Sequence, residues 1–133
     1  MTRRSRLIRQ AVLLIVLMGT AASASPPPPG DRAEAFAVCA GRLWALSVRQ
    51  KAVGDPEHEV TGLMRDDFDM LLDAVLPGAE SDARATHWRV DGWVQIAHLL
   101  ARHQYADTSR RRDLAAARME QRIATCRRMI PRR

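Results

Sequence analysis

Apolar residues recur every three or four positions along most of the chain after residue 30, which is the spacing of one face of an α-helix. No segment shows the alternation of apolar and polar residues that is typical of a β-strand. Four such periodic segments follow one another, and they predict α-helices over residues 32–53, 56–76, 82–106 and 109–130. The pattern therefore predicts an all-α protein.

The breaks between these segments are short and carry helix-ending or helix-capping residues. Gly54-Asp55-Pro56 combines a helix stop, a cap and a proline suited to the first helical position. Pro77-Gly78 is a second break, and Asp107-Thr108-Ser109 supplies the cap of the last helix. Because short links favour antiparallel neighbours, we expect a four-helix up-down-up-down bundle.

The periodicity also predicts which faces are buried. In the first helix only Arg42, Ala45 and Arg49 are expected to point away from the core, so this helix should be the most buried. In the second helix the expected inner arc is Val60, Leu63, Met64, Phe68, Leu71, Leu72 and Val75. The third helix buries Ala85, Trp88, Gly92, Trp93, Ile96, Leu99 and Leu100, and the fourth Ala115, Ala116, Met119, Ile123, Cys126 and Ile130.

The first residues are typical of a secretory signal peptide. Four arginines and no acid precede an apolar run over 11–18, and Ala22-Ser23-Ala24 forms a cleavage signature. The apolar run is too short to cross a bilayer, which needs roughly 20 residues. We therefore expect cleavage after residue 24 and export to the periplasm or the extracellular space, the alternative being an uncleaved anchor. A proline-rich lead-in, 25–30, then precedes a helical domain, 31–130, and a basic tail, 131–133.

Removal of the signal peptide changes the charge of the protein. The full chain has a formal net charge of +6, and loss of the four leader arginines lowers it to +2, so the charge gives no reason to expect nucleic-acid binding. The remaining charge is uneven, with −5 over residues 25–100 and +7 over 101–133. A candidate binding surface for an acidic envelope protein or an anionic envelope surface comprises Arg110, Arg111, Arg112, Arg118 and Arg122. The alternative is a solvated helix face.

The chain contains two cysteines, Cys39 and Cys126, and no C-x-x-C motif. In an exported protein this pattern favours one structural disulfide. In the expected bundle the first and last helices are antiparallel neighbours, and the two cysteines differ in height by roughly 5 Å at 1.5 Å per residue. The predicted disulfide is therefore consistent with the predicted bundle.

Two charged residues interrupt apolar faces. Asp67 projects into the inner arc of the second helix, and Arg89 lies among the apolar residues of the third. An isolated buried charge is very costly, so we expect a buried ion pair between them. The alternatives are edge positions that reach water, or binding of a small apolar or anionic ligand near Trp88, Arg89 and Trp93.

The sequence indicates no catalytic chemistry. His87 and His98 are three helical turns apart, roughly 16 Å, which is too far for one metal ion. No C-x-x-C-H haem attachment, glycine-rich phosphate loop or nucleophile constellation is present. We therefore expect no metal, no cofactor and no enzymatic activity.

Three short motifs resemble a group of small exported bacterial helical proteins. They are Cys39-Ala40-Gly41-Arg42-Leu43, Trp88-Arg89-Val90 and a single cysteine near the end of the last helix. The resemblance covers most of residues 36–130 and implies the helical fold and the disulfide. Members of the group often carry polar and aromatic residues after the first motif, where this chain has residues 47–51, Ser-Val-Arg-Gln-Lys. No activity follows from the resemblance, so we expect an exported binding or accessory module.

Overall fold

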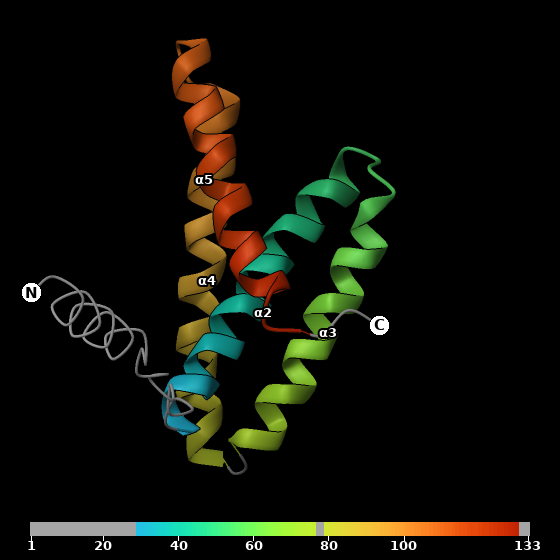
Figure 1. The fold of residues 1–133 in the computed structure, drawn as a ribbon, viewed down its shortest axis with the longest axis vertical. Helices are drawn as coiled ribbons and strands as arrows, with labels where there is room; N and C mark the ends of the chain where they lie inside the picture. The colour runs from blue at the N-terminus through green and yellow to red at the C-terminus, as the bar shows by residue number, and fades with distance from the viewer. Residues whose placement is uncertain (1–28, 77–78, 131–133) are drawn as a thin grey trace, which may run out of the picture.

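The computed structural model of the chain describes residues 29–76 and 79–130. They form four α-helices and no strand: α2 (Pro29–Ala52), α3 (Glu57–Val75), α4 (Ala79–Tyr105) and α5 (Ser109–Arg127). Successive helices run in opposite directions (Figure 1), which confirms the predicted all-α, up-down-up-down fold. The expected signal peptide, the Pro77-Gly78 break, the basic tail and residues 25–28 of the lead-in lie outside the described residues.

The helices begin and end near the residues that the sequence provides as caps, with two exceptions. Gly54 has a φ of 74°, a left-handed conformation that glycine adopts at little cost after a helix. Asp55 accepts a hydrogen bond from the backbone N–H of Glu57 at 2.9 Å, and Thr108 accepts one from Arg111 at 3.3 Å. The first exception is α2, which begins at Pro29 within the predicted lead-in, so that Asp31 lies in its first turn. The second is α4, which begins at Ala79, three residues before the predicted start.

The central element of the fold is α2. It packs against α3 on one side and α4 on the other, while α5 runs along α4 and reaches α2 over a short stretch (Figure 1). Within the described residues, α3 makes no close backbone contact with α4 or α5. The side chains around α2 therefore form the core.

The contact between α2 and α4 depends on two glycines. A Cβ atom at Gly41 would overlap the backbone carbonyl of Arg89, and one at Gly92 would overlap that of Val38. Both glycines are buried. Since the overlapping atoms belong to backbone, the helices can lie this close only because neither residue has a side chain.

The main hydrophobic core is built from all four helices. Its buried members are Cys39, Ala40, Leu43, Ala45, Phe68, Ile96, Leu99, Ile123 and Cys126. A smaller cluster at the start of α2 contains Ala33, Ala37, Leu72 and Ala85. The inner stripe predicted for α5 is confirmed at its three buried positions, Ala115, Ile123 and Cys126.

Three predicted faces are wrong in part. On α4, Trp93 was expected on the buried face and is 39% exposed. On α2, Ala45 is buried rather than outward, because α2 is covered from two opposite sides. On α3, the buried residues are Thr61, Phe68 and Leu72. Val60 and Leu63, expected in the inner arc, are 55% and 67% exposed, so the true inner face is rotated away from them.

The far end of α4 and the start of α5 project away from α2 and α3 as a two-helix hairpin (Figure 1). We call this part, residues 101–114, the α4–α5 tip. All of its residues except Ala106 are exposed, including Tyr105 at 79%. The tip is therefore the least covered part of the described chain.

Candidate functional site

A disulfide between Cys39 and Cys126 joins α2 to α5, as predicted. The S–S distance is 2.06 Å, the Cα atoms are 5.5 Å apart, and both residues are buried. The bond fixes the end of α5 against the middle of α2. Any side chain within one turn of either cysteine is therefore held near the other helix.

Two arginines next to the disulfide meet at one glutamine. Arg42 of α2 donates from Nε and Nη2 to Oε1 of Gln95 on α4, at 3.1 and 2.8 Å. Arg122 of α5 donates to the same oxygen through Nη1. Nη1 of Arg42 also lies 3.9 Å from the Sγ atom of Cys126. Three helices thus contribute to one half-buried polar cluster, which we call the cluster with Gln95.

The electrostatics of this cluster are unfavourable for the charge on Arg42. Burial lowers the pKa of the Arg42 guanidinium, and the nearby positive charge of Arg122 lowers that pKa further. Sequence reasoning missed the cluster because Arg42 was assigned to the outward face of its helix. The signal was present in the spacing, since Arg42 follows Cys39 by three residues and Arg122 precedes Cys126 by four.

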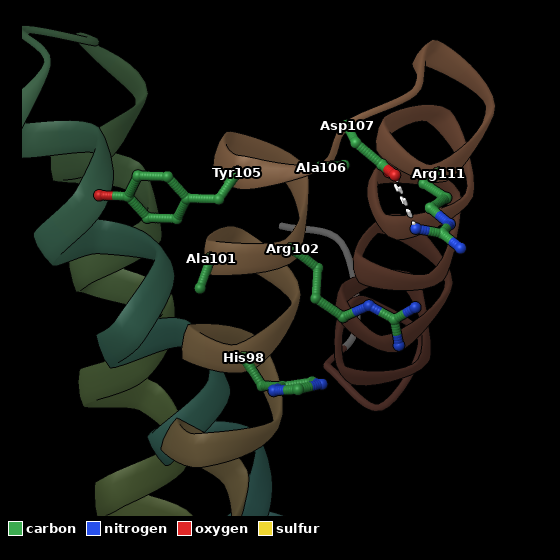
Figure 2. Close-up of a pocket in the computed structure, with 7 residues that line it drawn as sticks. All are labelled: His98, Ala101, Arg102, Tyr105, Ala106, Asp107 and Arg111. Atoms are coloured by element: carbon green, nitrogen blue, oxygen red, sulfur yellow. Dashed lines mark hydrogen bonds and ion pairs between the residues drawn. The ribbon is translucent and has the colours of Figure 1, made fainter.

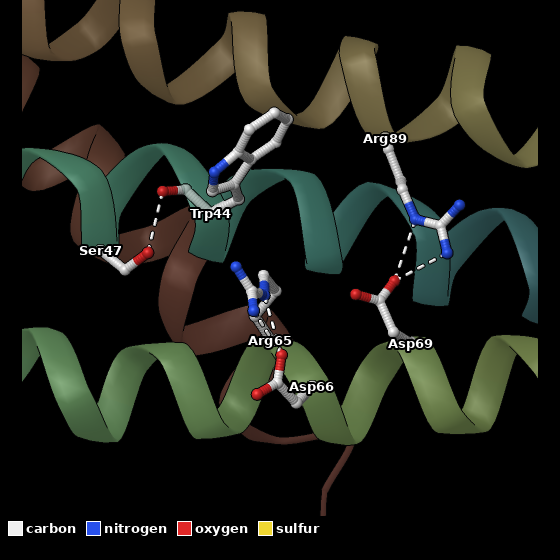
Figure 3. Close-up of polar contacts among 6 residues, drawn as sticks. All are labelled: Trp44, Ser47, Arg65, Asp66, Asp69 and Arg89. Carbon is white, nitrogen blue, oxygen red and sulfur yellow. Dashed lines mark hydrogen bonds and ion pairs between the residues drawn. The ribbon is translucent and has the colours of Figure 1, made fainter.

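Arg89, one member of the predicted ion pair, binds the carboxylate of Asp69, and the predicted contact between Arg89 and Asp67 stays a prediction. Arg89 donates from Nε and Nη2 to Oδ1 of Asp69, at 2.9 and 2.8 Å (Figure 3). Residues two apart on a helix project about 200° from each other, so Asp67 and Asp69 lie on opposite flanks of the inner face. The side chains of Arg89 and Asp69 are 31% and 36% exposed, so this pair is also less buried than expected.

The tryptophans proposed for ligand binding have separate environments. Trp88 packs against the smaller hydrophobic cluster, and the guanidinium of Arg84 lies 6.0 Å from its ring centre. Trp93 is 39% exposed, and Trp44 of α2 is 48% exposed. Arg89, between the two α4 tryptophans, is already bound to Asp69.

The predicted basic surface is divided between two settings. Arg122 takes part in the cluster with Gln95, and Arg111 donates to both carboxylate oxygens of Asp107 at 2.9 and 3.0 Å. The other three members, all exposed, are Arg110, Arg112 and Arg118. Within the described residues, the structure records no acidic partner for these three.

A shallow hollow of about 510 Å³ lies on the α4–α5 tip and the turn before it. Figure 2 shows Arg102 and His98 of α4 on one side of the helix, toward α5, with Tyr105 and Ala101 on the other side. The remaining lining residues are Ala106, Asp107 and Arg111. This part of the molecule presents both cationic and apolar groups to solvent.

Other classes of site find no support in the described residues. No group of three or more His, Cys, Asp or Glu side chains there is placed to hold a metal ion. No helix within residues 29–76 and 79–130 combines the length and apolarity needed to cross a membrane. No protein-family model, no curated protein and no solved structure matches the chain.

Proposed function

We propose that the mature chain is an exported accessory module of the cell envelope that binds an acidic protein segment through its α4–α5 tip and the arginine that follows it. The observation that carries this proposal is a set of exposed arginines for which the described residues provide no recorded acidic partner. Arg110 and Arg112 lie on the hairpin that projects from the fold, and Arg118 follows it on α5. Guanidinium groups bind carboxylates through paired, charge-assisted hydrogen bonds.

The placement of these arginines favours a protein partner over a flat anionic membrane. Arg110 and Arg112 are two residues apart on α5, so they project to opposite sides of the helix. A planar surface would contact only one of them at a time. An acidic segment that crosses the start of α5 can reach both, and the exposed ring of Tyr105 at the end of α4 adds apolar surface to the tip.

Export is the second part of the proposal. It is supported by the basic and apolar start of the chain and by the disulfide, which is stable in oxidising compartments. Intact-mass analysis of the exported protein should give a mature chain that begins at Ser25. A membrane-held species that retains residues 1–24 would contradict this.

Binding can be tested with a fluorescently labelled hexaglutamate peptide, measured by anisotropy on the oxidised mature protein. The triple variant Arg110→Gln, Arg112→Gln, Arg118→Gln should bind the peptide at least about tenfold more weakly, since hydrogen bonds to charged groups are lost. A matched triple variant, Arg49→Gln, Arg84→Gln, Arg128→Gln, removes the same charge from exposed positions elsewhere. Equal weakening in both variants would show non-specific attraction and contradict the proposal, as would preferential binding to phosphatidylglycerol vesicles.

A further inference from the structure

The oxygen atom that accepts from both Arg42 and Arg122 has fewer lone pairs than the two guanidinium groups have N–H donors. An amide oxygen is neutral and has two lone pairs, whereas each guanidinium has five N–H donors and a full positive charge. Three N–H groups already converge on Oε1 of Gln95. Within the described residues neither arginine has a recorded carboxylate partner, so two like charges share one neutral oxygen.

The disulfide keeps the two arginines together despite their repulsion. Arg42 and Arg122 lie within about one helical turn of Cys39 and Cys126 respectively. The geometry is therefore fixed before any ligand arrives. Preorganised donors of this kind bind an oxyanion without paying to assemble the site.

A hollow of about 370 Å³ opens beside this cluster, along α2. Arg42 and Gln95 line one end of it, and Asp31 and Glu34 line the other. Apolar contact between the two ends comes from Ala35, Val38 and Met129. The hollow thus presents donors at one end and carboxylates at the other.

From this arrangement we infer that the hollow binds a short peptide or amino-acid-like molecule with one carboxylate and one ammonium group. The carboxylate takes donors of Arg42, the arginine that lines the hollow, and Arg122 adds a positive charge next to Arg42. The ammonium lies toward Asp31 and Glu34. Glu34 and Arg42 are eight residues apart, about 12 Å along the helix axis. Three extended residues span about 10 Å, and the side chains of Glu34 and Arg42 can reach across the remaining distance. The acidic end disfavours ligands with several negative charges.

This site goes beyond the proposed function and does not depend on it. The acidic partner of the α4–α5 tip is polyanionic, whereas the hollow beside the disulfide selects a ligand with both charges. The variants that test the two proposals affect different arginines. Loss of hexaglutamate binding and loss of ligand binding in the hollow can therefore be told apart.

The test is a titration of the ¹⁵N-labelled, oxidised mature protein with triglycine, followed by NMR at the Gln95 side-chain amide and the arginine Nε–H groups. Triglycine should shift these signals saturably, and triglycinamide, which lacks only the carboxylate, should not. N-acetyl-triglycine, which lacks only the ammonium, should bind more weakly. Absence of a saturable shift with triglycine, or equal shifts with triglycinamide, would overturn the inference. Equal binding of N-acetyl-triglycine would overturn the role of Asp31 and Glu34.

Variants locate the site independently. Arg42→Gln should weaken triglycine binding about tenfold, because a charge-assisted hydrogen bond to the carboxylate is lost. Arg122→Gln should weaken it less, because only a neighbouring positive charge is lost. Arg127→Gln is the matched control, since it removes the same charge from an exposed residue of α5 that pairs with Glu120. Circular dichroism identifies a variant that fails to fold, and the comparison of triglycine with triglycinamide on the unmodified protein needs no variant. Affinities equal to that of Arg127→Gln would overturn the inference.

Discussion

The two sides of α2 hold their neighbours in different ways. On the α4 side, Gly41 and Gly92 bring the two backbones into contact, and the Cys39–Cys126 bond adds a covalent tie to α5. On the α3 side, contact is made by side chains such as Phe36 and Phe68, whose ring centres are 6.0 Å apart. The first side has no room for an added methyl group, whereas the second can adjust by moving side chains. The α4 side therefore defines the rigid part of the molecule.

The largest expected effect comes from the covalent tie. Cys126→Ser should lower the free energy of unfolding by about 2–5 kcal/mol, because an 87-residue separation gives the unfolded chain much freedom to lose. Chemical denaturation of the oxidised protein and the variant measures this difference. Free thiols in protein recovered from its native compartment would contradict the disulfide itself.

The next effect is steric. Gly41→Ala should cost about 3 kcal/mol in the free energy of unfolding, because the new methyl group meets the backbone of Arg89 and the helices must separate. Gly62→Ala is the matched control on α3, where an added Cβ meets nothing within 4 Å. There alanine should stabilise the helix by about 0.5–1 kcal/mol. Similar changes in both variants would remove the contrast between the two sides of α2.

A change on the α3 side should be smaller. Phe68 is fully buried, yet its neighbours are side chains that can rearrange around a somewhat smaller residue. Phe68→Leu should therefore cost about 1–1.5 kcal/mol, near the range of conservative hydrophobic replacements. A thermal denaturation series measures this, and a loss larger than that of Gly41→Ala would reverse the comparison.

The smallest effect is expected for the polar bridge that crosses α2. Arg89 and Asp69 join α4 to α3 in front of α2 (Figure 3), and water reaches both side chains. Their coupling in a double-mutant cycle should be below about 1 kcal/mol. The cycle uses Asp69→Asn, Arg89→Gln and the double variant. Coupling of several kcal/mol would mean that the α3 side is held electrostatically after all.

Much of the fold was predictable because periodicity and caps report local preferences. Apolar periodicity predicted the four helices, and the glycine and aspartate at 54 and 55 predicted the end of the first. The heights of Cys39 and Cys126 on their helices supported the disulfide. The inner face of α3 was not predictable in this way. Val60 and Leu63 are apolar and well spaced but exposed, so the periodicity predicted an inner face rotated from the true one. The contact between Arg89 and Asp69 was not among the predictions.

The candidate site was less predictable than the fold, since it depends on how three helices meet. Arg42 has a polar side chain on a helix covered from two sides, and only the disulfide brings it to Arg122. Gln95, the acceptor that both arginines share, carries no signal of its own in the sequence. The role of Gln95 depends on where Arg42 and Arg122 lie, so it can be recognised only once the three helices are placed.

The position of the disulfide also sets an order of events during biosynthesis. Cys126 follows Cys39 by 87 residues and lies near the end of α5, so the bond cannot form until most of α5 has been made. By then α2, α3 and α4 have all been synthesised, and the glycine contact between α2 and α4 can already be in place. Oxidation at that stage joins α5 to helices that have already had time to pack, and an error in their packing would then be held in place by a covalent bond.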